Sequence, residues 1–284
     1  GVPDLTNANV LPTIGSKEFI ASAANATREN GYEMVLWTSE MHNLEELRQS
    51  TQQGLVDGVV AMEVYLHDER IPLWREAGLP FSLIGRSADT AGISYVDADF
   101  ELAGSDVVRY LRGLGHTHIG FLNQSQPVTE AGYGPAVRTQ HSYEQAMDTA
   151  GLIRVVRTCP TNAAAGYDSF EQLLAEDPDL TALVTVNDRA VPGVVQAITG
   201  RGWRIPDDFS LVVVGSSGSV AELMTPPVTT VEPQNAEMGR QGVRLLLEQL
   251  EAREPEITQI LLPCRLVVRG SSGPCPVERR GTIS

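Results

Sequence analysis

The chain has 284 residues, of which 42% are hydrophobic and 20% charged, a composition typical of a globular protein with one large domain or two of ordinary size. Its formal net charge of −15 argues against nucleic-acid binding by these residues themselves, because phosphate contacts require clustered lysine and arginine and the one dense basic run is VERR at 277–280. No apolar stretch reaches the ~18 residues that span a bilayer, and the N-terminus shows neither the basic start nor the apolar core of a secretion signal.

The three cysteines, Cys159, Cys264 and Cys275, lie far apart and form no CxxC pair. Such cysteines are most simply free thiols of a protein in a reducing compartment. We therefore expect a cytoplasmic protein that makes no contact with a membrane.

Short apolar, β-branched runs alternate along the chain with amphipathic segments of helical length. The predicted strands are 57–62, 80–85, 118–122, 153–158, 182–186, 209–215, 227–231 and 260–268. The predicted helices are 17–30, 43–54, 99–114, 140–150, 167–176, 188–201 and 236–252, with Asp99 as the N-cap of the third.

Near-continuous apolar strands that alternate with helices predict parallel sheets covered on both faces. The spacing is compatible with a barrel or with two doubly wound sheets. The closely spaced elements after residue 227 favour a chain that crosses between two lobes near its end. Ligands of open parallel sheets bind beyond the carboxyl ends of the strands, which marks as candidate ligand loops residues 4–9, 63–65, 123–126, 187–188 and 216–219.

A series of motifs then runs through the chain almost from end to end. They are PDLTN (3–7), RENGYEMVL (28–36), VDGVVAM (56–62), GLPFSLIGR (78–86), YVDADFELAG (95–104), LRGLGHTHIGFL (111–122), TALVTVNDRAVPGVVQAITGRGWRIPDDFSLVVVG (181–215), LMTPPVTTVEP (223–233), EMGRQGVRLLL (237–247) and LVVRGSSGP (266–274). In this order and spacing the sequence resembles the effector-binding region of the LacI/GalR family of bacterial transcription regulators.

The resemblance implies an α/β fold of the periplasmic binding protein-like type I. Two doubly wound parallel-sheet lobes are joined by three crossovers, with a ligand cleft between them. We expect residues 1–123 and 235–256 to form the N-terminal lobe, 124–234 and 257–274 the C-terminal lobe, and 275–284 a tail. The family also implies a small-molecule effector, a homodimer, and DNA contact only through an N-terminal helix-turn-helix that is absent from this chain.

Asn187 and Asp188 lie where a predicted strand meets a helix. Either residue is suited to cap the helix by accepting hydrogen bonds from its first N–H groups. In the family this pair lies beside the ligand, so ligand binding and capping are both open.

Arg138 and Thr139 precede Tyr143 in GPAVRTQHSYEQAM. The family places an arginine four residues before this aromatic position, where its guanidinium binds ligand oxygens in a bidentate manner. Here Thr139 holds that position and Arg138 is one residue out of register. Either residue is a candidate ligand contact, and a solvated Arg138 is the alternative.

Other candidates follow from the loops that the family uses for its ligand. Asn7 and Phe19 belong to the region after the first strand, where the family has aromatic rings that cover the ligand; a surface turn is the alternative for Asn7. The remaining candidates follow strands or occupy family positions near the ligand: Glu63, Tyr65, Gln124, Thr161 and Gln234.

The segment GSSGS (215–219) ends a predicted buried strand. The family commonly reads Gly-aromatic-Asp-Asp there, and the first aspartate accepts hydrogen bonds from sugar hydroxyls. In this chain Ser216 holds the aromatic position and Ser217 the first acidic one. The resemblance therefore implies a site of altered shape and charge.

Motifs of enzymes are not found in the sequence. His116 and His118 form an HxH pair without a third residue spaced to complete a metal site. There is no GxSxG elbow around Ser217, no GxGxxG and no P-loop. We therefore expect no enzyme, no cofactor and no metal.

The leading hypothesis is the effector-sensing core of a LacI-type bacterial transcriptional regulator that binds a small molecule, such as a sugar or related metabolite. The first alternative is a periplasmic-type sugar-binding receptor of a transport system on the same fold. An α/β hydrolase is the second, and it would require turnover of an ester or glycoside that is lost on Ser217→Ala.

Overall fold

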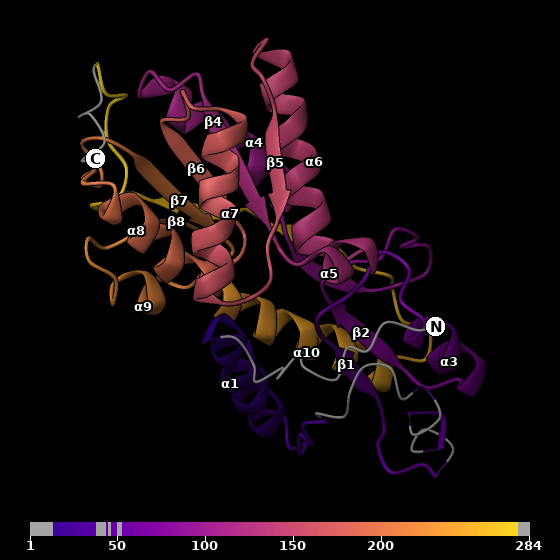
Figure 1. The fold of residues 1–284 in the computed structure, drawn as a ribbon. Coiled ribbons are helices and arrows are strands. Elements are labelled where there is room, and N and C mark those ends of the chain that lie inside the picture. The colour runs from indigo at the N-terminus through magenta and orange to yellow at the C-terminus, as the bar shows by residue number, and fades with distance from the viewer. Residues whose placement is uncertain (1–13, 38–43, 45–46, 50–52, 278–284) are drawn as a thin grey trace. The chain divides into compact units, whose positions relative to one another are not determined.

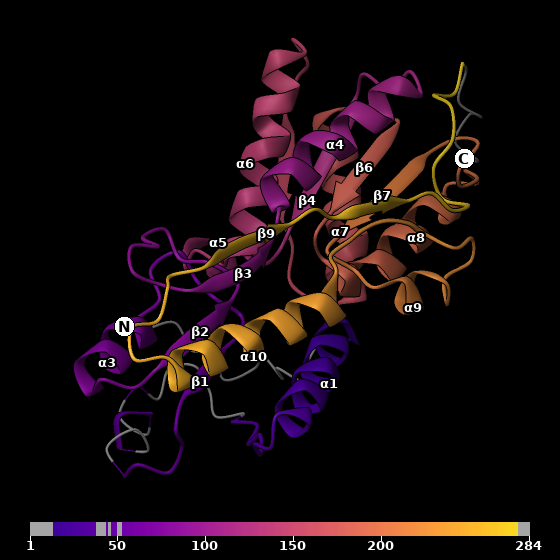
Figure 2. The ribbon, with the colours of Figure 1, turned by 180° about the vertical axis from the view of Figure 1, so that it is seen from behind.

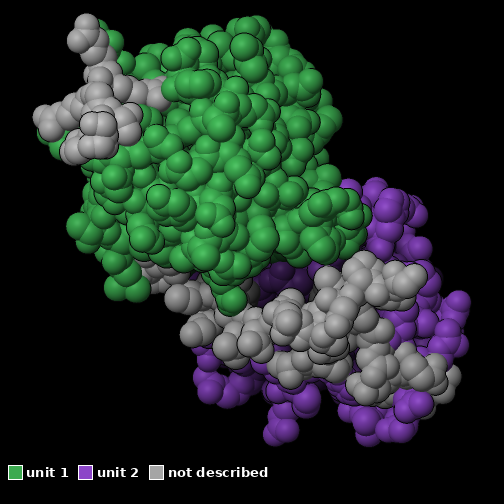
Figure 3. Space-filling model, in the orientation of Figure 1, with its two compact units in different colours: residues 1–9, 99–233, 263–284 green, residues 10–98, 234–262 purple. Residues whose placement is uncertain are grey.

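The computed structural model describes residues 14–37, 44, 47–49 and 53–277 (Figure 1). They form two compact units, which Figure 3 colours separately. Unit 1 contains residues 99–233 and 263–277, and unit 2 contains the described residues up to 98 together with 234–262. Within the described residues the chain passes between the units three times, which agrees with the predicted number of crossovers.

Unit 2 is built on a four-stranded sheet in which all neighbouring strands are parallel. In sheet order the strands are β1 (Val59–Ala61), β2 (Phe81–Ile84), β3 (Tyr95–Ala98) and β9 (Gln259–Leu262). Its helices are α1 (Ile14–Glu29), α3 (Arg70–Ala77) and α10 (Asn235–Glu251).

Strand β2 is covered on both faces, since its side chains alternate between two helical layers. Phe81 packs against Trp74 of α3, with the ring centroids 5.3 Å apart. On the opposite face the Ser82 hydroxyl donates to the carbonyl of Gly242 in α10 at 2.7 Å, and Ile84 lies against the same turn. This double burial explains why the strand reads as one continuous apolar run in the sequence.

Unit 1 is built on a six-stranded sheet whose strands are parallel except for the edge strand β10. In sheet order the strands are β10 (Arg265–Val267), β8 (Thr229–Glu232), β7 (Ser210–Val214), β6 (Ala182–Thr185), β4 (Ile119–Asn123) and β5 (Val155–Thr158). Its helices are α4 (Phe100–Gly113), α5 (Gln126–Glu130), α6 (Gly134–Thr149), α7 (Ala163–Glu176), the 3-10 turn η1 (Asp188–Ala190), α8 (Val191–Gly200) and α9 (Gly218–Ala221).

Helices α7 and α8 cover the sheet face turned to the viewer in Figure 1, and α4 covers the face seen in Figure 2. The Tyr143 ring of α6 packs on Phe121 of β4, with the ring centroids 4.8 Å apart. Its hydroxyl donates to the Ile119 carbonyl at 2.6 Å. Helices α4 and α6 touch at Gly104, where an added Cβ would lie 2.0 Å from the Ser142 Oγ. The glycine therefore allows the two helices to approach closely at this point.

The segment after β10 is held on the sheet of unit 1 by hydrogen bonds of buried residues. Ser271 accepts the Leu211 N–H through its carbonyl at 2.7 Å, and Gly273 donates its N–H to the Ser210 hydroxyl at 3.0 Å. The ring nitrogen Nε2 of His116 lies 3.0 Å from the Gly273 carbonyl oxygen. The serines of LVVRGSSGP thus hold the C-terminal part of the described chain on the sheet.

The unit boundaries differ from those expected. The first crossover was placed after residue 123, whereas the structure has it between Ala98 and Asp99, because β4 lies between β5 and β6 and α4 packs on α6. The last crossover, expected after residue 256, follows Leu262, because β9 pairs with β3. Cys275 of the expected tail belongs to unit 1 and donates its N–H to the Leu114 carbonyl at 2.8 Å; residues 278–284 lie outside the described chain.

Candidate functional site

Three of the predicted site residues meet at the carboxyl ends of β4, β5 and β6. The amide Nε2 of Gln124 donates to the Val186 carbonyl at 2.6 Å, and its Oε1 lies 3.4 Å from the Thr161 hydroxyl. The amide Nδ2 of Asn187 donates to the Cys159 carbonyl at 2.8 Å. Ligands of open parallel sheets bind at this edge, so the structure gathers a neutral set of hydrogen-bonding groups where a ligand is expected.

Asn187 and Asp188 differ in burial and in hydrogen bonding. Asn187 is fully buried and makes no side-chain cap bond; its Oδ1 has no hydrogen-bond partner among the described residues. Asp188 is half-buried, and burial raises the pKa of its carboxyl while hydrogen bonds from the N–H groups of Arg189 and of Asp188 itself oppose the shift. Asn187 therefore ties β6 to β5, and Asp188 is the more accessible of the pair.

The structure distinguishes Arg138 from Thr139. The Thr139 hydroxyl is fully buried and donates to the Pro135 carbonyl of its own helix at 2.7 Å. Arg138 keeps 7% of its surface exposed, and its Nε lies 3.9 Å from a carboxylate oxygen of Glu101 in the first turn of α4. Of the two residues, Arg138 is therefore the one whose polar side-chain atoms lie nearer the surface, and it is the better candidate for a ligand contact.

Ser216 and Ser217 follow β7 and are 6% and 4% exposed. The next residue, Gly218, packs against an ion pair: Arg269 Nη2 lies 2.8 Å from Glu232 Oε1, and a Cβ on the glycine would lie 2.9 Å from that nitrogen. The sequence reasoning missed this pair, whose members are 37 residues apart. Within GSSGS, Gly218 therefore packs beside the half-buried guanidinium group of Arg269.

Asn123 belongs to the candidate ligand loop 123–126, but the sequence reasoning gave it no individual role. It is fully buried at the end of β4, and its Nδ2 donates to the Gln140 Oε1 at 2.5 Å and to the Ala136 carbonyl at 3.3 Å. Its Oδ1 accepts the N–H of Gln124 at 2.7 Å. Asn123 therefore fixes the backbone of a candidate ligand residue against α6, and the signal for it was an amide that directly follows the apolar run IGFL.

Glu63 and Tyr65 lie in unit 2, in the loop after β1. Both side chains are half-buried. Burial raises the pKa of the Tyr65 phenol, and the nearby Glu63 carboxylate raises it further. The two candidates flank Val64, which is buried in the core of unit 2.

Three further residues were predicted as ligand contacts. Phe19 is a half-buried residue of α1, and its carbonyl oxygen lies against Gly239 of α10. Gln234 is exposed directly before α10, and its carbonyl accepts the Met238 N–H at 2.9 Å. Asn7 lies outside the described residues.

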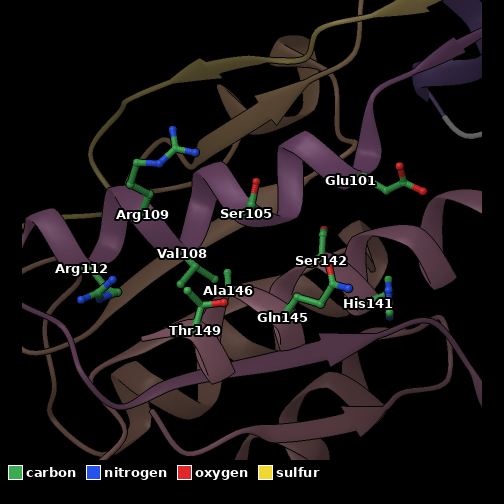
Figure 4. A pocket seen from close by; sticks show the side chains of 10 residues that line it. All are labelled: Glu101, Ser105, Val108, Arg109, Arg112, His141, Ser142, Gln145, Ala146 and Thr149. Carbon is green, nitrogen blue, oxygen red and sulfur yellow. The ribbon is translucent and has the colours of Figure 1, made fainter. Parts of the chain in front are cut away.

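A groove of about 650 Å³ runs between α4 and α6 of unit 1 (Figure 4). Its lining includes Arg109 and Arg112 of α4 and His141 and Gln145 of α6. None of the predicted site residues lines it. The groove is therefore distinct from the cluster at the carboxyl ends of the strands.

The two histidines of the HxH pair each have a structural partner. His116 is buried with Nδ1 2.8 Å from the Thr181 hydroxyl, and His118 Nδ1 lies 2.9 Å from the Asp177 carboxylate. No group of three His, Cys, Asp or Glu side chains suited to a metal ion was found in the described part of the chain. In that same part, no helix has the length and apolar character needed to cross a membrane.

Comparison with known proteins gives a consistent result. The family model of the periplasmic binding protein-like domain matches residues 108–272. The HTH-type transcriptional regulator CelR of Thermobifida fusca is 28% identical over 87% of this chain and 72% of its own length. The regulator DegA of Bacillus subtilis (strain 168) is 27% identical over 96% of this chain and 79% of its own length.

Solved structures agree with these sequence matches. A transcriptional regulator CelR–cellobiose complex superposes with a TM-score of 0.79 at 25% identity, over 91% of this chain and 79% of that one. A LacI family regulator from Bifidobacterium animalis subsp. lactis DSM 10140 superposes with a TM-score of 0.82 at 21% identity, over 92% of this chain and 95% of that one. The chain therefore belongs to the periplasmic binding protein-like domain family, within the group that forms the effector-binding regions of LacI-type transcription regulators.

Proposed function

We propose that this chain senses a small polyhydroxylated molecule, such as a sugar, and thereby controls DNA binding by a helix-turn-helix domain that lies outside these 284 residues. The observation that carries the proposal is the match to named transcription regulators along 87% and 96% of the chain. The same matches disfavour a transport receptor on the same fold.

The chemistry at the strand ends of unit 1 supports a neutral, hydroxyl-rich ligand. Gln124, Thr161 and Asp188 offer donors and acceptors, and sugar hydroxyls can use both kinds. Two arginines of unit 1 face carboxylates of the chain itself: Arg138 faces Glu101, and Arg269 pairs with Glu232. Cellobiose is bound by the solved CelR relative, which supports the same class.

A ligand can act only through a difference in its affinity for two states of the protein. In the proposed mechanism the bound sugar favours one arrangement of the loops that follow the parallel strands. In a homodimer of the complete regulator, this preference changes the fraction of dimers competent to bind DNA. We place this regulator in the cytoplasm, and its action requires no chemical reaction of the ligand.

A thermal-unfolding screen tests the proposal, with a panel of disaccharides including cellobiose, monosaccharides including ribose, nucleosides and small carboxylic acids. A ligand present at about 100 times its Kd adds about 2.7 kcal/mol to the free energy of unfolding, which raises the Tm by roughly 5 °C or more for a chain of this size. Arg112→Ala, in the groove between α4 and α6, is the matched control and should leave the shift unchanged. If no compound of the panel raised the Tm, the sensor function would be refuted in this form.

A further inference from the structure

Glu63 has an unusual backbone conformation. Among the described non-glycine residues, Glu63 is the one with a positive φ, +53°. The left-handed region is unfavourable for a residue with a Cβ, and such strain persists only where surrounding contacts enforce it. Glu63 lies two residues after β1, in a loop at the carboxyl end of a parallel strand, so the contacts that enforce its conformation shape a candidate ligand loop.

The enforcing contacts come from one arginine at the start of α3. The Nη2 of Arg70 donates to the carbonyl oxygens of Met62 and Glu63, both at 3.1 Å. The guanidinium also binds the Asp68 carboxylate in a bidentate manner, with Nε–Oδ1 at 2.8 Å and Nη2–Oδ2 at 2.6 Å. The same carboxylate accepts the N–H of Tyr65 at 3.3 Å. We call Arg70 and Asp68 together the loop clamp.

The loop clamp is largely removed from solvent. The side chains of Arg70 and Asp68 are 14% and 4% exposed, and the guanidinium lies 5.7 Å from the centre of the buried Trp74 ring. A planar guanidinium with bidentate contacts is held in one orientation far better than an ammonium group. The clamp is therefore a rigid element of unit 2.

The conformation that the clamp enforces determines which side chains the loop presents. Val64 is turned into the core, where it lies against Gly85. The neighbours Glu63 and Tyr65 both remain partly exposed. The strained turn thus places a carboxylate and a phenol, the two ligand candidates of unit 2, on the outside of the same short loop.

We propose that Arg70 is a positioning residue for ligand binding: through the loop clamp it holds Glu63 and Tyr65 in the arrangement that meets a hydroxyl-rich ligand. Arg70 acts through these two residues and makes no ligand contact of its own. The inference rests on the proposed function, because it takes the loop after β1 in unit 2 as a loop that binds the ligand.

The first test compares Arg70→Met, Arg70→Lys and the control Arg75→Met by calorimetric titration with cellobiose and ribose. Arg75 belongs to the same helix and donates to the Ala91 carbonyl at 2.5 Å from an exposed position, so its loss removes an arginine–carbonyl bond outside the loop. We expect at least 10-fold weaker binding for Arg70→Met, partial recovery for Arg70→Lys, and less than a 2-fold change for Arg75→Met. Urea unfolding and circular dichroism establish that each variant is folded at the assay temperature.

A double-mutant cycle separates positioning from a general loss of structure. If Arg70 acts through Tyr65, adding Tyr65→Ala to Arg70→Lys should weaken binding much less than Tyr65→Ala does in the original chain. Additive losses would overturn the inference. So would sugar binding by Arg70→Met that equals binding by the original chain.

A measurement without ligand keeps the proposal testable if a variant is unstable or neither sugar binds. Amide hydrogen exchange of residues 62–68 should accelerate at least 10-fold in Arg70→Lys and stay unchanged in Arg75→Met. Unchanged exchange in Arg70→Lys would refute the clamp itself. An original chain that binds no compound of the thermal-unfolding panel, with the clamp confirmed by exchange, would refute the sensing function and with it the role of Arg70 in that function.

Discussion

Arg138 provides the sharpest test of the ligand site in unit 1. Its side chain is 8% exposed, whereas that of its partner Glu101 is 51% exposed. The 3.9 Å ion pair is therefore largely screened by solvent, and it contributes less than about 1 kcal/mol to stability. A hydrogen bond from a charged group to a ligand contributes about 1.5–3 kcal/mol.

We therefore predict that Arg138→Ala weakens binding of the tightest sugar of the panel by about 10- to 150-fold. Thr139→Val, an isosteric change at the next residue, removes the bond to the Pro135 carbonyl. It should lower the free energy of unfolding by about 0.5–1.5 kcal/mol without changing the Kd. Titration calorimetry of the two variants, at a temperature where both are folded, measures the difference.

Two results would contradict this reasoning. A Kd within 2-fold of the original for Arg138→Ala would make Arg138 a structural residue. Weaker binding by Thr139→Val than by Arg138→Ala would show that the buried hydroxyl becomes accessible to the ligand and that the register of the family applies directly.

Three further predictions concern the stability of unit 1. Burial lowers the pKa of His116, so the unfolded chain binds more protons than the folded chain below the ordinary pKa of about 6.5. The free energy of unfolding should therefore fall as the pH drops from about 6.5 through the folded-state pKa. Urea unfolding at pH 7.5 and 5.5 should show a smaller decrease in this free energy for His116→Gln than for the original chain. Gly104→Val should lower the free energy of unfolding by about 3 kcal/mol, because its Cβ would overlap the Ser142 Oγ; a loss below 1 kcal/mol would show that the helices separate easily. Tyr143→Phe should cost about 1–3 kcal/mol by leaving the Ile119 carbonyl unpaired, and a neutral effect would mean that water replaces the phenol.

Local patterns in the sequence predicted the elements that depend on local interactions. Helix α4 was predicted with its cap, and Asp99 Oδ1 accepts the Leu102 N–H at 2.9 Å as expected. The run 260–268 was predicted as one strand because it is largely apolar, with Arg265 as its one charged residue. The structure divides it at Pro263 and Cys264, since β9 belongs to the sheet of unit 2 and β10 to that of unit 1. A proline within a strand was the available signal for this break.

Strand β3 was not predicted, for a reason that also applies to the missed site residues. It has four residues and contains Asp97, a charge that local reasoning assigns to a loop. In the structure the Asp97 carboxylate is buried, and Arg86 donates to it at 3.3 Å from beyond the end of the neighbouring strand β2. The partner that makes burial possible is 11 residues away, which a pattern along one segment does not reveal.

The positions of the ligand candidates were predictable in part, because the ends of parallel strands follow from the fold class. The rule singled out Gln124 and Asn187, whereas the family resemblance singled out Thr161. In the structure Gln124 lies 3.4 Å from the Thr161 hydroxyl and donates to the carbonyl of Val186, the residue before Asn187. Their individual roles were not predictable. Whether an amide faces a ligand or a backbone carbonyl depends on which loops lie beside it, and for Asn187 the partner is the Cys159 carbonyl directly after β5, two strands away in the sheet.

A charged residue directly after an apolar strand nevertheless carries information about its partner. An unpaired charge is too costly to bury, so Asp97 at the end of β3 and Glu232 at the end of β8 each imply a buried cation nearby. The sequence offers two arginines in the matching position, Arg86 after PFSLIG and Arg269 after LVV. Pairing strand-end carboxylates with strand-end arginines gives both of the observed ion pairs. The same ion pair is what Gly218 of GSSGS lies against, since a Cβ at that position would be 2.9 Å from Nη2 of Arg269.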